Sequence, residues 1–172
     1  MKRIGLISDT HSFLGDDVIK HLKDVDEIWH AGDIGNPKLI DQLEAINPVK
    51  GVYGNIDSKE VKLTFPLNNF FECEGVSVFM THIGGYPGRY TKRVKEILLK
   101  EKPQLYICGH SHICKVLKDV KLDLIHMNPG ACGHEGFHQF RTMLLFDCHD
   151  GKVGGLKLVE LGRRGQKYMN ND

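Results

Sequence analysis

The sequence predicts an α/β domain in which short buried strands alternate with amphipathic helices. Strand-length apolar runs at residues 4–7, 27–31 and 49–53 each end in polar residues, and a helical pattern follows the first two. Two further runs meet at Gly75, which is typical of a hairpin, so the sheet should turn antiparallel there. A chain of 172 residues can bury a substantial core.

The first predicted helix follows Asp16, which we expect to cap it, and its buried face carries Val18 and Leu22. The second begins at Asn36-Pro37. A third spans residues 89–102, and its apolar stripe faces inward. Its basic residues are expected to be solvated: Lys92, Arg93, Lys95 and Lys100.

The C-terminal third is expected to consist of strands. Their predicted ranges are residues 115–117, 122–127, 141–146 and 152–161, with a turn at residues 128–130. The final residues, 163–172, are polar and are expected to be a frayed tail. No linker or repeat indicates a second domain, so residues 1–162 are predicted to form one.

Composition excludes several classes of partner. Lys plus Arg total 23 against 22 for Asp plus Glu, so neither a nucleic acid polymer nor a membrane surface is expected as the main partner. No apolar run approaches the roughly 18 residues of a transmembrane helix, and the N-terminus does not resemble a signal peptide. Five cysteines without a C-x-x-C pattern favour a reducing compartment. We therefore expect a soluble, cytoplasmic protein.

Potential metal ligands stand at the ends of five predicted strands: Asp9, His11, Asp33, Asn55, His82, His110 and His112. Taken singly, Asp9 and His11 equally suggest a capped strand-to-helix turn, and residues 54–57 suggest an ordinary turn. Together, seven ligands are too many for one ordinary transition-metal ion. They suit two ions about 3.5–4 Å apart, with Asp33 as the bridging carboxylate because of its middle position. Mixed oxygen and nitrogen ligands favour manganese, the first expectation, or nickel, iron, zinc or cobalt.

Residues 134–138 match the H-E-x-x-H pattern of zinc proteases, which requires both histidines on one helix face. Pro129, Gly130, Gly133 and Gly136 argue against a helix here, so we expect a polar loop overlooking the site. His134 and His138 are then candidates for contacting a substrate. Arg89, at the end of a glycine-rich loop, is a further candidate for binding a phosphate.

The order D-x-H, G-D, G-N-x-D, H and G-H-x-H, from Asp9 onward, resembles the calcineurin-like metallophosphoesterase superfamily. The small size resembles its YfcE-type branch of small phosphodiesterases. The resemblance implies an α/β/β/α sandwich of two mixed sheets flanked by helices. It also implies one metal held by Asp9, His11, Asp33 and His112, and a second held by Asp33, Asn55, His82 and His110.

The resemblance and the residues together imply a phosphodiesterase in which a hydroxide bound to a dinuclear metal centre attacks phosphorus. Asp33 would bridge the metals, and Asn55 would help to neutralise the phosphoryl oxygens. Larger family members have histidine after this asparagine, whereas this chain has Ile56. Activated diesters are therefore the expected substrates, with nucleotide-type diesters among them. Asp57 is expected to orient Asn55 or another group that supports the metal ligands.

Many small relatives also have a Gly-His pair after the motif histidine, whereas Ile83-Gly84-Gly85 follows His82 here. This departure predicts a different substrate pocket. The competing function is a non-catalytic scaffold, because the same fold resembles a retromer subunit that binds proteins. All seven ligand positions are intact, which favours the enzyme. Pairing of two copies through an exposed edge stays open.

Overall fold

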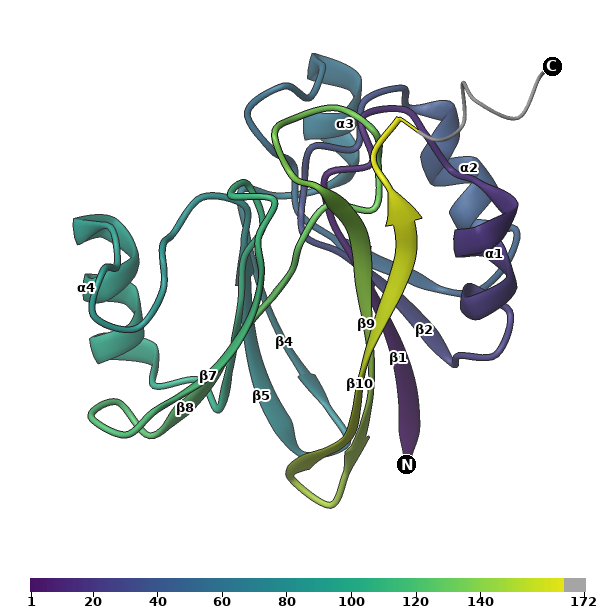
Figure 1. The fold of residues 1–172 in the computed structure, drawn as a ribbon. Helices are drawn as coiled ribbons and strands as arrows, with labels where there is room; N and C mark the ends of the chain where they lie inside the picture. Colours follow the sequence, from purple (N-terminus) through teal and green to yellow (C-terminus); the bar gives the residue numbers. More distant parts are fainter. Residues whose placement is uncertain (166–172) are drawn as a thin grey trace, which may run out of the picture.

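Ten strands form two facing sheets in the computed structural model, which describes residues 1–165 (Figure 1). The strands of the first sheet are β1 (Lys2–Ile7), β2 (Glu27–His30), β3 (Val49–Gly51), β9 (Phe140–His149) and β10 (Lys152–Arg163). Their order is β10-β9-β1-β2-β3. Because β1 pairs in parallel with β2 and antiparallel with β9, this sheet is mixed.

The second sheet is also mixed. Its strands are β4 (Asn68–Cys73), β5 (Val76–Thr81), β6 (Leu105–Ile107), β7 (Cys114–Asp119) and β8 (Leu124–Pro129), in the order β4-β5-β6-β8-β7. The predicted hairpin at Gly75 is confirmed, since β4 and β5 pair antiparallel with Cys73 opposite Val76. Strand β6 pairs in parallel with both β5 and β8.

Four helices cover the outer faces of the sheets: α1 (Asp16–Leu22), α2 (Lys38–Glu44), α3 (Lys59–Thr64) and α4 (Lys92–Glu101). Helices α1 and α2 flank the first sheet, and α4 flanks the second (Figure 1). Alternation along β1 sends Ile4 and Leu6 to the core between the sheets, whereas Ile7 packs with Val18 of α1. A third cluster joins α4 to the second sheet. The predicted four-layer α/β/β/α sandwich is therefore confirmed.

Several element boundaries differ from those predicted. Helix α1 has Gly15 as its N-cap and includes Asp16 as its first residue, so the predicted Asp16 cap is wrong. Helix α4 begins at Lys92 instead of residue 89, because the Thr91 hydroxyl caps it by accepting from the Val94 amide. Helix α3 had not been predicted. Strand β10 runs to Arg163, two residues beyond its predicted end, and residues 166–172 of the predicted tail lie outside the described residues.

The parallel pairings decide where the strand ends meet. Strands β1, β2 and β3 run in one direction, so the loops that follow them emerge at the same edge of the first sheet. Strands β5 and β6 likewise deliver their loops to one edge of the second sheet. No helix within residues 1–165 is long and apolar enough to cross a membrane. The five cysteines are free thiols.

Candidate metal centre

The loops after β1, β2, β5 and β6 bring six of the predicted ligands into two clusters. The first contains Asp9, His11 and His112, and the second contains Asp33, His82 and His110. Within each cluster, one potential ligand atom per residue lies within 4.8 Å of the others. Asp9 and His112, 103 positions apart in the chain, thus meet at the end of the sandwich, as their places after strands predicted.

The two clusters adjoin each other through their carboxylates. Asp33 Oδ2 lies 3.2 Å from His82 Nε2 in its own cluster and 3.6 Å from His11 Nε2 in the other. Asp9 Oδ1 lies 3.1 Å from His112 Nε2 and 3.9 Å from His82 Nε2. Each carboxylate therefore stands between imidazoles of both clusters, which is the placement that a bridging ligand requires.

Three of these ligand atoms are buried and have no hydrogen-bond partner among the described residues: Asp9 Oδ1, His11 Nε2 and His82 Nε2. A buried polar atom without a partner is costly, and such atoms are rare in folded proteins. A divalent cation accepts lone pairs from carboxylate oxygen and imidazole nitrogen together. The donor set of this site therefore fits metal ions.

The backbone holds His82 in the tautomer that a metal ligand needs. Its Nδ1–H donates to the Ala31 carbonyl oxygen at 2.7 Å, so Nε2 keeps its lone pair and points towards Asp33. Burial lowers the pKa of His82, but the neighbouring carboxylates of Asp33 and Asp9 outweigh it, and the net pKa is raised. Burial raises the pKa of Asp33, but the contact with His82 lowers it by more, so the net pKa is lowered.

A chain of two histidines sets the tautomer of His112. His138 Nε2 lies 3.0 Å from the Gly133 carbonyl oxygen, which can only accept, so this nitrogen carries the proton. Burial lowers the pKa of His138, so its ring is neutral and its Nδ1 accepts from His112 Nδ1 at 3.2 Å. His112 therefore uses Nδ1 for His138 and turns Nε2 towards Asp9 Oδ1, 3.1 Å away. His138 thus contacts a candidate ligand and is not among the residues that line the two cavities beside the centre.

Five of the candidate ligands adopt left-handed backbone conformations. The φ angles are 54° for Asp9, 45° for His11, 56° for Asp33, 68° for His110 and 58° for His112. This region is unfavourable for residues with a side chain, and such residues concentrate at functional sites.

Two motif glycines permit the close approach of the loops. A Cβ atom at Gly109 would lie 2.1 Å from Ser8 Oγ and 2.9 Å from Asp9 Oδ2. A Cβ atom at Gly54 would lie 2.0 Å from Asp33 Oδ1. All three distances are below van der Waals contact, so the loops could not approach this closely if either glycine were replaced by a larger residue.

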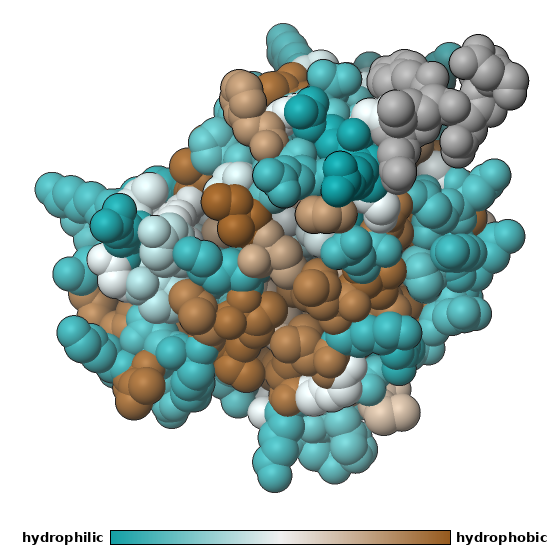
Figure 2. Space-filling model, viewed as in Figure 1, coloured by the Kyte–Doolittle hydropathy of each residue, from teal (hydrophilic) through white to brown (hydrophobic). Residues whose placement is uncertain are grey.

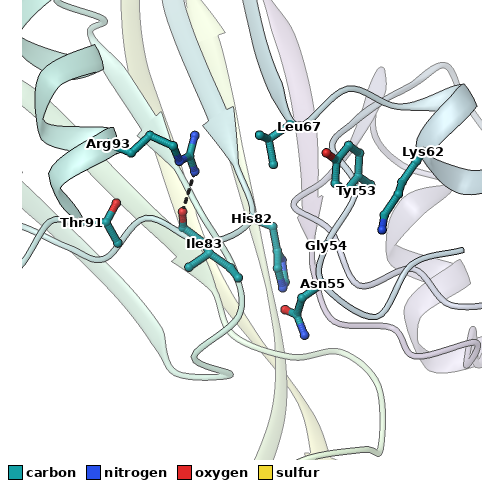
Figure 3. Close-up of a pocket in the computed structure, with 9 residues that line it drawn as sticks. All are labelled: Tyr53, Gly54, Asn55, Lys62, Leu67, His82, Ile83, Thr91 and Arg93. Atoms are coloured by element: carbon teal, nitrogen blue, oxygen red, sulfur yellow. Dashed lines mark hydrogen bonds between the residues drawn. The ribbon is translucent and has the colours of Figure 1, made fainter. Parts of the chain in front are cut away.

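Asp57 acts on the loop backbone that precedes Asn55. Its Oδ2 accepts from the Gly54 amide at 2.7 Å, and its Oδ1 accepts from the Gly35 amide at 2.8 Å. It thereby ties the Asn55 loop to the loop that follows β2. Asn55 itself is exposed, and Figure 3 shows its amide beside the His82 imidazole.

Two other predicted contact residues lie away from the ligands. His134 is buried, its ring packs edge-on against Phe13 at 4.4 Å, and its Nδ1 accepts from the Gly165 amide. Residues 134–138 contain no helix, as predicted, so the zinc-protease arrangement is absent from this segment. Arg89 lines neither of the cavities that adjoin the ligands.

Two cavities open beside the centre, and Ile83 lines both. The larger, of about 380 Å³, is lined by Tyr53, Gly54, Asn55, Lys62, Leu67, His82, Ile83, Thr91 and Arg93 (Figure 3). The smaller, of about 190 Å³, lies between residues 83–86 and the loop that carries His110 and Ser111.

The sequence did not indicate Lys62 or Arg93 as site residues. Arg93 was expected on a solvated helix face. Instead its guanidinium donates to Asn68 Oδ1, Thr81 Oγ1 and the Ile83 carbonyl oxygen at 2.7, 3.1 and 2.9 Å. Helical periodicity could not show this, because the three acceptors lie on other elements.

Fold and site together define an α/β/β/α sandwich with a candidate metal centre at one end of its sheets. The model of the calcineurin-like phosphoesterase superfamily domain matches residues 1–151. A probable metallophosphoesterase of Methanothermobacter thermautotrophicus is 32% identical over 133 residues, which cover 74% of this chain and 76% of that protein. The chain therefore belongs to the calcineurin-like phosphoesterase superfamily.

Solved structures share the fold over almost the whole chain. The structure of a novel archaeal phosphodiesterase superimposes with a TM-score of 0.71 at 21% identity, covering 92% of this chain and 99% of that one. Vps29 of Entamoeba histolytica, solved in complex with Zn²⁺, superimposes with a TM-score of 0.71 at 14% identity, covering 93% and 99%. At these identities the likeness concerns the fold alone.

Proposed function

We propose that this protein hydrolyses small phosphate esters, preferentially diesters, with two divalent transition-metal ions, of which manganese is the first candidate. The observation that carries the proposal is the pair of adjoining ligand clusters with buried, unpartnered ligand atoms. Membership of the phosphoesterase superfamily supports the reaction class.

The residues would divide between two ions as the motif order implies. Asp9, His11 and His112 would hold one, whereas Asn55, His82 and His110 would hold the other, with Asp33 shared. Two bound cations lower the pKa of water towards neutrality and neutralise charge on the transferred phosphoryl group. Asn55 has an exposed amide at the mouth of the larger cavity, where it can donate to a phosphoryl oxygen.

Neither the family histidine nor a carboxylic acid is available in the two cavities to protonate the leaving group. Ile56 takes the place of the family histidine and is 45% exposed, and no Asp or Glu is among the described residues that line the two cavities. An alcohol with a high pKa leaves slowly without an acid. Activated esters are therefore the better substrates.

The cavities favour a diester over a monoester. They lie on either side of Ile83, one beside His82 and the other beside His110. A phosphodiester carries two alcohol groups, and each cavity offers space for one. A monoester would fill only one of them.

The test is hydrolysis of bis-p-nitrophenyl phosphate and p-nitrophenyl phosphate by metal-stripped protein after addition of manganese, nickel, zinc or magnesium. We expect metal-dependent cleavage of the diester that Asp33→Asn reduces to the metal-free level. Asp24→Asn, which alters an exposed aspartate outside the site, is the matched control and should retain activity. If the protein binds two ions per chain but hydrolyses neither ester with any of the four metals, the proposal that it is an enzyme is refuted.

One observation favours the alternative, a protein-binding scaffold or a homo-oligomer. Apolar side chains gather on the face formed by β7 to β10 (Figure 2), where Leu117, Leu156 and Leu158 are exposed. Exposed apolar surface of this kind marks interaction sites in many proteins. The absence of turnover together with self-association through this face would support that function instead.

A further inference from the structure

We propose that the larger cavity binds one alcohol group of the diester, namely a nucleoside that carries a further phosphate, and that Tyr53 and Lys62 select it. The inference rests on the proposed function and names its substrate class. No family motif contains either residue. The cavity adjoins the metal centre at His82 and Asn55, so whatever it holds is attached to the phosphorus bound there.

The walls suit a flat apolar group. Leu67 is 43% exposed and Ile83 is 39% exposed, although both stand beside a buried polar centre. Tyr53 contributes a half-buried ring on the same side as Lys62 (Figure 3). A volume of about 380 Å³ lies within the range of small-molecule sites, which begins at about 300 Å³. A base and its sugar would cover these side chains.

The charge of the cavity calls for an anion. Lys62 and Arg93 line it, and no Asp or Glu is among its described lining residues. Arg93 is occupied by three neutral acceptors, so its charge remains but its orientation is fixed. The Lys62 ammonium lies 5.3 Å from the centroid of the Tyr53 ring, and no Asp or Glu among the described lining residues of the cavity faces it. It therefore keeps its three donors for a ligand.

Hydrogen bonds hold the backbone that carries Tyr53 and Lys62 in place. The Tyr53 amide donates to the Pro66 carbonyl oxygen at 3.1 Å, which joins the two ends of the segment that contains α3. Ser58 caps α3 by accepting from the Val61 amide, and Val61 is fully buried. Lys62 follows Val61 and is held at the cavity by this helix. An acyl chain would leave the positive charges of Lys62 and Arg93 without an anion, so the pattern favours an aromatic ring with a phosphate.

The first test is calorimetric binding of thymidine 3′,5′-bisphosphate and thymidine 3′-phosphate to manganese-loaded protein. Charge-assisted contacts of this kind change affinity by about tenfold. We expect the bisphosphate to bind about tenfold more tightly and Lys62→Ala to abolish the difference. Lys59→Ala removes an exposed charge from the same helix, outside the cavity, and should preserve it.

A second variant tests the ring. Tyr53→Leu keeps an apolar wall but removes the flat aromatic face, so it should weaken both thymidine ligands severalfold while leaving the affinity for inorganic phosphate unchanged. Equal affinity of the wild type for the two thymidine ligands, or equal losses in Lys62→Ala and Lys59→Ala, would overturn the inference.

Turnover of bis-p-nitrophenyl phosphate, measured on the same samples, separates this inference from the proposed function. Hydrolysis without discrimination between the thymidine ligands would retain the phosphodiesterase and refute the nucleotide cavity. Discrimination without hydrolysis would retain the cavity and refute the phosphodiesterase.

Discussion

His138→Ala should weaken one of the two proposed metal sites and leave the other unchanged. His138 donates from Nε2 to the Gly133 carbonyl oxygen, so its Nδ1 can accept from His112 Nδ1. This contact leaves His112 Nε2 free to bind a cation. Alanine removes that acceptor. His112 can then protonate at Nε2 or rotate, and both changes compete with metal binding. The second cluster contains no contact with His138 and should be unaffected.

The expected magnitude follows from the surroundings of His138. Loss of a partner that orients a metal-binding histidine lowers metal affinity by about 10–100-fold. His138 is half-buried, so water can enter the vacated space and accept from His112 Nδ1. We therefore expect the lower end of the range, about tenfold, which corresponds to about 1.4 kcal/mol.

The assay is a competitive manganese titration that resolves the two sites. His138→Gln offers a carboxamide that can accept from His112 and donate to Gly133, so it should recover part of the affinity. His149→Ala, which removes an exposed histidine at the far end of β9, serves as the control. Unchanged manganese binding in His138→Ala, or equal losses of affinity at both sites, would refute the idea that His138 sets the tautomer of His112.

Three further predictions concern stability and the centre. Burial raises the pKa of Glu27, but hydrogen bonds from Lys2 and Lys50 lower it to about 2, so its contribution is present above its ordinary pKa of 4.5 and lost as the pH falls towards 2. Urea unfolding should show Glu27→Gln less stable by about 3 kcal/mol at pH 7, with a shrinking difference in acid. Gly109→Ala should abolish metal binding in the same titration, since its Cβ would overlap Ser8. Manganese at 100 times its dissociation constant should stabilise the wild type by about 2.7 kcal/mol per site, measured by thermal unfolding, and chelation should remove the gain.

The sequence could predict the strands because their apolar runs are short and bounded by glycine or polar residues. It could also place the ligands, because each follows such a run. It could not assign strands to sheets. Strand β9 lies between β1 and β10 and pairs Lys2 with Cys148. No local pattern of either strand specifies a partner so distant in the chain.

Sequence patterns missed the features that depend on contacts between distant parts of the chain. Helix α3 has six residues and buries only Val61, which is too little periodicity to distinguish it from a loop. Arg93 shows the same limit for function. Helical spacing places it on the exposed face of α4, yet its acceptors lie on β4, on β5 and in the loop after β5.

The left-handed conformations of five candidate ligands are a feature of the geometry that the motif order could not describe. Such conformations persist only where the surroundings over-determine them. Here the loops brace one another, because the Asp9 amide donates to the Gly32 carbonyl at 2.9 Å and the His11 amide donates to the Asp33 carbonyl at 3.1 Å. The Gly109 amide likewise donates to the His82 carbonyl at 3.0 Å. The loop after β1 is thus tied to the loop after β2, and the loop after β6 to the loop after β5, so the candidate ligands stand on backbone that the fold already braces.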